Sequence, residues 1–248
     1  MTVALEVAEI YKNFGGLTAV NNVSFKIESG SITGIIGPNG AGKTTTFNTI
    51  AGVCRPSSGK IYFEGDRIDG RKPSFICKKG IARTFQVVRV FREITVYEHI
   101  VMGAVAGKSV FSSRSYNDEG ITEILELTGF ASVKDHLTGN LTSTRQKQLG
   151  LATALATNPK IILLDELMAG LNDKEIEECL SLLRKINEEM GITLIVIEHV
   201  MKAVMSLCEK IIVMDTGKVI AEGTPSEIAN NELVINAYLG KEKPVCLS

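Results

Sequence analysis

The sequence lacks a charge of one dominant sign, and this absence argues against a nucleic-acid partner. Its 248 residues include 27 lysines and arginines and 28 aspartates and glutamates, which gives a formal net charge of −1. A chain that holds a nucleic acid usually carries a marked positive field that attracts the phosphates. We therefore expect no nucleic acid among its partners.

Cysteine motifs are also lacking. The five cysteines show neither a C-x-x-C pair nor any other metal-ligand spacing. This distribution predicts reduced thiols in a cytosolic protein rather than disulfides or a zinc site. The cysteines are Cys54, Cys77, Cys179, Cys208 and Cys246.

Long apolar runs and a signal peptide are absent as well. The first ten residues do not show the basic stretch followed by an apolar stretch that directs secretion. The most apolar segments, residues 161–164 and 192–197, are far shorter than the roughly 20 residues that cross a bilayer. If the protein works at a membrane, we expect another chain to span it.

Short runs rich in β-branched residues are present, and turn residues separate them. Several are apolar on both faces, which is typical of buried strands in a parallel or mixed sheet. Residues 174–190 have an apolar stripe with the period of a helix, and Gly191 follows as a stop signal. This alternation predicts an α/β fold. The expected strands are residues 23–27, 31–36, 60–63, 81–85, 161–165, 193–198 and 211–214.

The middle of the chain has a different character. Residues 93–156 contain few β-branched runs, and residues 120–128 and 146–156 have helical patterns. The Ser-rich stretch 107–117 is typical of a surface loop. We therefore expect a helical subdomain inserted into one α/β domain, with no internal repeat.

A phosphate-binding loop follows the expected strand 31–36. The segment Gly37-Pro38-Asn39-Gly40-Ala41-Gly42-Lys43-Thr44 fits the pattern G-x-x-x-x-G-K-[ST], and a helix-compatible segment follows. Glycines let successive backbone N–H groups point at phosphate oxygens, the lysine supplies positive charge, and the threonine hydroxyl can bind Mg²⁺. A Gly-rich turn that only joins strand to helix would explain the glycines but not Lys43 and Thr44.

Two carboxylates end the buried strand 161–165. Asp165 and Glu166 form a weak signal alone, but together with a P-loop they predict a site where Asp165 holds Mg²⁺ and Glu166 polarises the attacking water. His199 follows the next apolar strand, either as a core or cap residue or within reach of the γ-phosphate. Gln86 also ends a strand, where a glutamine is usually only solvated.

These motifs together resemble the ATP-binding cassette (ABC) family, and most closely the ATP-binding subunits of branched-chain amino acid importers. The resemblance extends over residues 5–240 and depends on several motifs in the right order. They are Phe14-Gly15-Gly16-Leu17, the P-loop, Arg83-Thr84-Phe85-Gln86, Leu163-Leu164-Asp165-Glu166, Ala169-Gly170-Leu171-Asn172, Ile197-Glu198-His199 and Ala237-Tyr238-Leu239-Gly240.

The resemblance implies a domain organisation. Residues 1–92 and 157–240 would form a P-loop ATPase core with an antiparallel β subdomain. Residues 93–156 would form the helical subdomain, and residues 241–248 a C-terminal tail.

The resemblance also implies ATP and Mg²⁺ as cofactors, and a role for each motif. Phe14 would stack on adenine, with Tyr11 as the alternative; an ordinary half-buried aromatic is the other interpretation of Phe14. The segment 169–172 would communicate across a dimer. The implied catalytic residues are Glu166, His199 and Lys43. The implied nucleotide contacts are Phe14, Gly37, Asn39, Gly40, Ala41, Gly42, Lys43, Thr44 and Thr45, and the implied magnesium ligands are Thr44, Gln86 and Asp165.

One motif departs from the family pattern. The family's Leu-Ser-Gly-Gly-Gln signature, which completes the site of the opposite subunit, corresponds here to Leu141-Thr142-Ser143-Thr144-Arg145. Thr142 still offers a hydroxyl, but Thr144 places a β-branched side chain where the family has glycine beside the γ-phosphate. Leu167 also replaces the proline that usually follows the catalytic glutamate. We therefore expect a heterodimer with a paralogous subunit and two unequal sites, although self-association remains the other arrangement.

The implied function is ATP hydrolysis that powers a membrane importer of branched-chain amino acids or a related small polar solute. The implied partners are transmembrane permease subunits and, indirectly, a solute-binding protein, at the cytoplasmic face of the membrane. A soluble ABC ATPase acting on DNA or ribosomes would be expected to carry tandem cassettes, a long coiled coil or basic runs. A catalytically impaired partner subunit is the alternative that Thr144 and Leu167 suggest. A GTPase is disfavoured because the sequence has no N-K-x-D motif.

Overall fold

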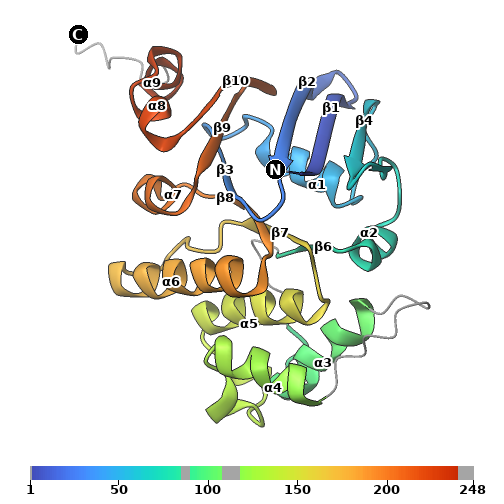
Figure 1. Cartoon of the computed structure of the whole chain (residues 1–248), viewed down its shortest axis with the longest axis vertical. Helices are drawn as coiled ribbons and strands as arrows, with labels where there is room; N and C mark the ends of the chain where they lie inside the picture. The colour runs from blue at the N-terminus through green and yellow to red at the C-terminus, as the bar shows by residue number, and fades with distance from the viewer. Residues whose placement is uncertain (1, 85–89, 108–117, 240–248) are drawn as a thin grey trace.

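Strands of β-branched and aliphatic residues form a six-stranded sheet that organises the molecule (Figure 1). The structure is a computed structural model, and it describes residues 2–84, 90–107 and 118–239. The strand order is β10-β9-β3-β8-β7-β6, with β10 antiparallel to β9 and the other neighbours parallel. The strands are β3 (Ile32–Ile36), β6 (Ile81–Arg83), β7 (Ile161–Asp165), β8 (Thr193–Ile197), β9 (Lys210–Asp215) and β10 (Lys218–Gly223).

A second, antiparallel sheet lies beside it, with the order β2-β1-β4-β5. In β2, inward side chains such as Val23, Phe25 and Ile27 alternate with exposed ones, as expected when only one face is buried. This sheet packs over α1 (Figure 1). Its strands are β1 (Val3–Phe14), β2 (Leu17–Glu28), β4 (Ser58–Phe63) and β5 (Asp66–Arg67).

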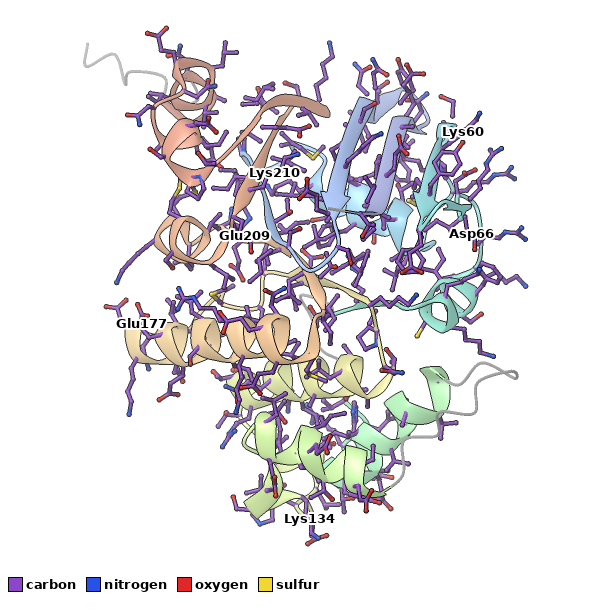
Figure 2. All side chains as sticks on the ribbon, viewed as in Figure 1. Lys60, Asp66, Lys134, Glu177, Glu209 and Lys210 are labelled. Carbon is purple, nitrogen blue, oxygen red and sulfur yellow. The ribbon has the colours of Figure 1, made fainter. Side chains whose placement is uncertain are left out.

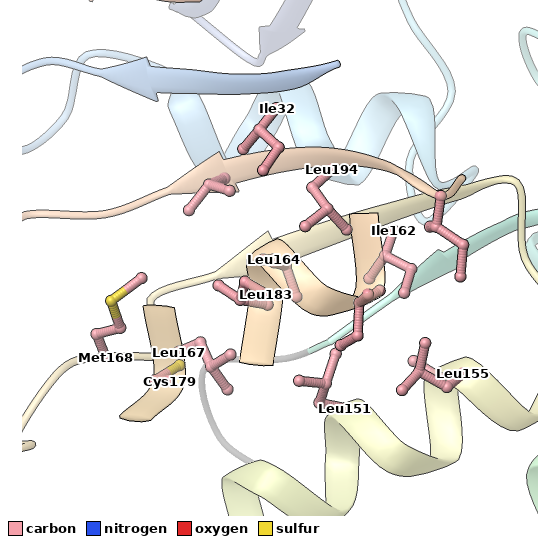
Figure 3. Close-up of a cluster of buried hydrophobic side chains, with 14 of the residues drawn as sticks. Ile32, Leu151, Leu155, Ile162, Leu164, Leu167, Met168, Cys179, Leu183 and Leu194 are labelled. Atoms are coloured by element: carbon pink, nitrogen blue, oxygen red, sulfur yellow. The ribbon is translucent and has the colours of Figure 1, made fainter. Parts of the chain in front are cut away.

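Helices cover both faces of the larger sheet. Ile162 and Leu164 of β7 face the cluster that contains Leu151 and Leu155 of α5 and Leu183 of α6 (Figure 3). The alternate residues of β7 belong to the other cluster, with α1 and the antiparallel sheet. The helices are α1 (Lys43–Ile50), α2 (Pro73–Lys79), α3 (Val96–Gly107), α4 (Asp118–Leu127), α5 (Ser143–Ala156), α6 (Asp173–Met190), α7 (Met201–Leu207), α8 (Pro225–Ala229) and α9 (Glu232–Leu239), with 3-10 turns at Ala131–Val133 and Thr138–Asn140.

Helices α3, α4 and α5 gather at the end of the molecule opposite the antiparallel sheet (Figure 1). Two glycines of α3 let its backbone approach α5 closely. A Cβ atom at Gly103 would lie 2.3 Å from the carbonyl oxygen of Thr153, and one at Gly107 would lie 2.3 Å from that of Thr157. Larger residues at these positions would therefore push the two helices apart.

The surface carries charges of both signs, as the composition predicts. Charged side chains project from many elements (Figure 2), and several pair across the surface, such as Lys79 with Asp66 and Lys210 with Glu222, both at 2.6 Å. Within the described residues, no helix is both long and apolar enough to span a bilayer.

The predicted fold class is confirmed, and most predicted elements are present. The prediction missed the strands β1, β5 and β10 and the helices α2, α3 and α7–α9. It also began α5 three residues late, because Thr142 caps that helix at Ser143. The predicted stop at Gly191 is confirmed, since this residue closes α6 with a φ of 65°. The predicted loop 107–117 lies almost wholly outside the described residues.

Candidate active site

The P-loop turns sharply between β3 and α1, and its conformation depends on two glycines. Gly37 and Gly42 have φ angles of 150° and 96°, which residues with a side chain rarely adopt. A Cβ atom at Gly37 would lie 2.0 Å from the carbonyl oxygen of Met214, and one at Gly42 would lie 2.4 Å from that of Ala19. Neither position can therefore carry a larger residue without a shift of the backbone.

Lys43 is the first residue of α1, and its ammonium group lies inside the loop. Its Nζ donates to the carbonyl oxygens of Gly37 at 2.8 Å and Pro38 at 3.0 Å, and the residue is only 6% exposed. The N-terminus of α1 adds the positive end of a helix dipole at this point. Among the other predicted contacts, Ala41 is buried, Thr45 is half-buried, and Asn39, Gly40 and Thr44 are exposed. The loop thus presents positive charge and a helix N-terminus, a combination that suits an anion.

Asp165 ends β7, and the structure gives it a partner that the sequence did not reveal. Its Oδ2 accepts from the guanidinium of Arg83 at 2.8 Å, and both side chains are buried. Arg83 also donates to Oδ1 of Asn48, on α1, at 2.6 Å. Because β6 and β7 are parallel neighbours, Arg83 and Asp165 meet at the same edge of the sheet.

Thr44 and Asp165 line one cavity of about 870 Å³. A hydroxyl and a carboxylate are oxygen ligands of the kind that Mg²⁺ prefers. Both side chains thus offer the kind of oxygen ligand that a magnesium ion would need, and Asp165 would have to bind it beside its contact with Arg83. Gln86, the third predicted ligand, lies outside the described residues.

Glu166 and His199 follow the parallel neighbours β7 and β8, and their side chains meet. Oε1 of Glu166 lies 3.0 Å from Nε2 of His199. The Glu166 side chain is 17% exposed and that of His199 is 44% exposed. His199 is therefore not a core residue, and the contact joins the two residues at the edge of the sheet. Glu166 also has a φ of 51°, unusual for a residue with a side chain.

Two further charged residues, neither of them among the predicted site residues, support the turn after β7. Glu198 is 2% exposed, and its Oε1 accepts from the backbone N–H of Met168 at 2.7 Å. Burial raises the pKa of Glu198 to about 7. Lys147 of α5 donates to the carbonyl oxygens of Glu166 at 3.3 Å and Ala169 at 2.7 Å. Glu198 stands beside His199 in the sequence, but no local pattern indicates the role of Lys147.

Phe14 lies at the end of β1, where the antiparallel sheet turns. The residue is 52% exposed, and Nζ of Lys12 lies 4.8 Å from the centre of its ring. This exposure is more than an ordinary half-buried aromatic would have, and it leaves the ring accessible to a flat ligand. Tyr11, the alternative, is half-buried.

The segment that corresponds to the signature lies at the start of α5. Thr142 is the N-cap, and its side chain accepts from the backbone N–H of Arg145 at 3.3 Å. Thr142 and Ser143 are exposed, and Thr144 is half-buried. An exposed helix N-terminus of this kind can present backbone amides to a partner's ligand.

Comparisons with known proteins agree with this geometry. A family model described as "ABC transporter" matches residues 20–169, and one described as "Branched-chain amino acid ATP-binding cassette transporter" matches residues 218–244. The high-affinity branched-chain amino acid transport ATP-binding protein BraF of Pseudomonas aeruginosa is 39% identical, over 96% of this chain and 98% of BraF. The ADP conformation of MJ1267, an ATP-binding cassette of an ABC transporter, has a TM-score of 0.86 at 30% identity and covers 97% of this chain and 100% of MJ1267. A dimeric cassette, MJ0796, has a TM-score of 0.77 at 26% identity, over 89% of this chain and 98% of MJ0796.

Proposed function

The chain belongs to the ABC transporter family, and from this membership we propose that it hydrolyses ATP to power a membrane importer of branched-chain amino acids or a related small polar solute. The observation that carries the proposal is the convergence of Lys43, Asp165, Glu166 and His199 at one edge of the larger sheet. The P-loop supplies positive charge there, and β7 and β8 supply the groups that act on the γ-phosphate.

The P-loop binds the nucleotide. Its backbone N–H groups and the N-terminus of α1 surround the phosphates, with contacts from Asn39, Gly40, Ala41 and Thr45. The Lys43 ammonium exchanges its two carbonyl partners for the β- and γ-phosphate oxygens. Phe14 stacks on the adenine, since its ring is exposed at the end of β1.

Hydrolysis uses the groups at the ends of β7 and β8. Thr44 and Asp165 would hold Mg²⁺, which when bound would neutralise charge on the phosphates. Glu166 orients the attacking water and accepts its proton, and His199, 3.0 Å from the carboxylate, fixes the position of that carboxylate. Arg83 fixes the position of Asp165, because its guanidinium donates to the Asp165 carboxylate at 2.8 Å.

The membrane partner is a permease, and we assign its docking position to the cavity of about 870 Å³. Apolar side chains of α3 and its surroundings stand exposed there, among them Phe91 and Met102. A cytoplasmic helix of the permease fits this chemistry, because an amphipathic helix places its apolar face in such a groove. The cavity also reaches Thr44 and Asp165, so the permease would lie next to the magnesium site. On this proposal the chain would lie at the cytoplasmic face of the membrane, and a solute-binding protein would act on it only through the permease.

The protein works as a dimer of cassettes, and its signature favours a paralogous partner. Thr142, Ser143 and Thr144 would complete the site whose P-loop belongs to the other subunit. The Thr144 side chain stands where a glycine would leave more room for the γ-phosphate. We therefore assign the more active site of a heterodimer to the P-loop of this chain and the signature of its partner.

Titration with Mg²⁺-ATP tests the nucleotide site. The full chain, together with its companion subunits, should bind Mg²⁺-ATP saturably, and Lys43→Ala should weaken binding by roughly 30-fold or more, because a charge pair is lost. Lys185→Ala is the matched control, since Lys185 is an exposed lysine of α6. Unchanged binding by Lys43→Ala, or no saturable binding by the wild type, would contradict the proposal.

The solute is tested separately in vesicles that contain the permease. ATP inside the vesicles should drive uptake of labelled leucine that the solute-binding protein delivers. Uptake of an amide or urea instead of leucine would support the importer function but show that the transported solute is not a branched-chain amino acid.

A further inference from the structure

The turn that carries Glu166 is held from two sides by charged groups. We call residues 166–169 the catalytic turn. On one side, the buried Glu198 carboxylate accepts from the backbone N–H of Met168 at 2.7 Å. On the other side, the Lys147 ammonium donates to the carbonyl oxygens of Glu166 and Ala169, at 3.3 and 2.7 Å. The opposite ends of the turn are thus tied by one lysine.

Lys147 belongs to α5, and α5 begins at the segment corresponding to the signature. Thr142 caps this helix, and Lys147 follows five residues later, which is about one and a half helical turns. A helix is stiff over so short a length. A shift of residues 142–144 therefore also displaces Lys147 and its ammonium group. The helix that offers its N-terminus to the partner therefore also touches the turn that carries this chain's own Glu166.

The backbone of Glu166 needs such support. Its φ of 51° lies in the left-handed region, which costs a residue with a side chain roughly 1–2 kcal/mol. Strained conformations of this kind persist only where several contacts fix them. The N–H of Glu166 is fixed by the carbonyl oxygen of Ile197 at 2.9 Å, and its carbonyl oxygen accepts from Lys147. Loss of the lysine would remove one of these contacts and loosen the backbone that places the carboxylate, which would keep its contact with His199.

The charges around the turn also act on one another. Burial is the main cause that raises the pKa of Glu198, the nearby Glu166 raises it further, and the Lys147 ammonium lowers it by a smaller amount. Burial is the main cause that raises the pKa of the Cys179 and Cys208 thiols, and the charge of Glu198 raises it further, for Cys208 after that of Glu209. Lys147 therefore favours the charged form of the buried Glu198 carboxylate behind the catalytic turn.

We propose that Lys147 is a positioning residue that couples the partner-facing segment 142–144 to the placement of Glu166 in the same chain. This inference rests on the proposed function, because it takes Glu166 as the group that activates water. When residues 142–144 bind the partner's nucleotide, α5 shifts together with Lys147. The catalytic turn shifts with them, because Lys147 is hydrogen-bonded to it. Occupation of one site of the dimer would thereby adjust the other.

The first test replaces the lysine and separates binding from catalysis. Lys147→Met should lower the rate of hydrolysis at saturating Mg²⁺-ATP by roughly 10- to 100-fold, the effect of moving a catalytic group by about an ångström. The Kd for Mg²⁺-ATP and the melting temperature should stay near the wild-type values. Lys147→Arg keeps the charge and the donors and should restore most of the rate, and Lys185→Met should leave it unchanged.

A wild-type rate in Lys147→Met would overturn the proposal. A loss of rate matched by an equal loss of ATP affinity would overturn it too, because Lys147 would then act on binding. Should the methionine variant fail to fold, Lys147→Gln replaces it, with the same expected direction.

A double-mutant cycle shows whether Lys147 acts through Glu166. In a Glu166→Gln background, Lys147→Met should lower the residual hydrolysis by less than about twofold, because the carboxylate that it positions is already gone. A full further loss would mean that Lys147 acts elsewhere and would overturn the coupling. If Glu166→Gln alone hydrolysed ATP at the wild-type rate, the proposed function of Glu166 would fail instead, whatever Lys147 does.

Discussion

The catalytic turn and the segment 142–145 both face phosphate chemistry in the proposed function, yet the fold secures them by different means. A buried carboxylate and a half-buried ammonium group hold the catalytic turn: Glu198 accepts from one backbone amide, and Lys147 donates to two carbonyl oxygens. The segment 142–145 depends on the exposed cap of Thr142 and on Arg145, which reaches Gly129 and Gln148 at 3.4 and 3.2 Å. The first arrangement is internal to one chain, whereas the second lies at a surface.

This difference shows which half of the site the chain builds by itself. The P-loop, Asp165, Glu166 and His199 are brought together within one subunit, so their geometry is set before any partner arrives. The segment 142–145 completes a site only when another subunit covers it. In the proposed function, its departure from the family pattern at Thr144 therefore acts directly on the partner's site, and on this chain's own half only through the proposed link by Lys147.

The largest expected effect comes from the catalytic turn itself. Glu166→Gln should retain ATP binding but slow hydrolysis by roughly 10²- to 10⁴-fold, the usual contribution of a positioned base. Measurement of phosphate release at saturating Mg²⁺-ATP, together with an ATP-binding titration, separates the two effects. Glu177→Gln on α6 is the control, because Glu177 is exposed and pairs only loosely, at 3.7 Å, with Lys202. A wild-type rate in Glu166→Gln would show that another group activates the water.

The next effect concerns the charge that holds the turn. The pKa of Glu198 is raised from 4.5 to about 7 in the folded protein. Between these pH values the folded state keeps a proton that the unfolded chain has released, so the free energy of unfolding falls as the pH rises. Above pH 7 the full cost of burying the carboxylate is present, at most about 3 kcal/mol.

Glu198→Gln removes this titration while its side-chain oxygen can still accept from Met168. Urea unfolding at pH 5, 6, 7 and 8 should show the variant gaining stability relative to the wild type as the pH rises. The exposed control Glu177→Gln should show no such trend. If the free energies of unfolding of the wild type and Glu198→Gln changed with pH in the same way, the Glu198 carboxylate would not be desolvated. The catalytic turn would then not differ from the segment 142–145 by a buried charge.

The same contrast explains what the sequence could predict. The P-loop, Asp165, Glu166 and His199 follow strands directly, and a strand end is visible in a local pattern. The link between Arg83 and Asp165 depends on β6 pairing with β7, which are 80 residues apart in register at Ile81 and Ile161. The role of Lys147 depends on α5 lying against the catalytic turn. Such contacts come from the tertiary arrangement and leave no short pattern.

Missed elements have a similar reason. In β1, charged and polar residues such as Glu6, Glu9 and Lys12 alternate with buried ones. This half-exposed strand therefore has no continuous β-branched run by which it could be predicted.

The roles of the individual site residues and the domain boundaries stay predictions, because they depend on bound nucleotide and on partner chains.

The smallest expected effect tests the surface segment. Thr144→Gly should raise hydrolysis at the site that this segment completes by roughly tenfold, because overpacking beside a ligand costs about 1–3 kcal/mol. The measurement uses a heterodimer in which Lys43→Ala has inactivated this chain's own P-loop, so that all hydrolysis comes from the partner's P-loop.

Ser143→Gly is the matched control, since Ser143 is exposed and its change adds the same backbone freedom to the start of α5. If both variants changed the rate equally, flexibility of the helix start would be the cause rather than the bulk of Thr144. Equal rates of hydrolysis at the two sites of the unmodified heterodimer would contradict the proposed asymmetry. The segment 142–144 would then support hydrolysis at the partner's P-loop as well as the partner's signature supports it at this chain's P-loop.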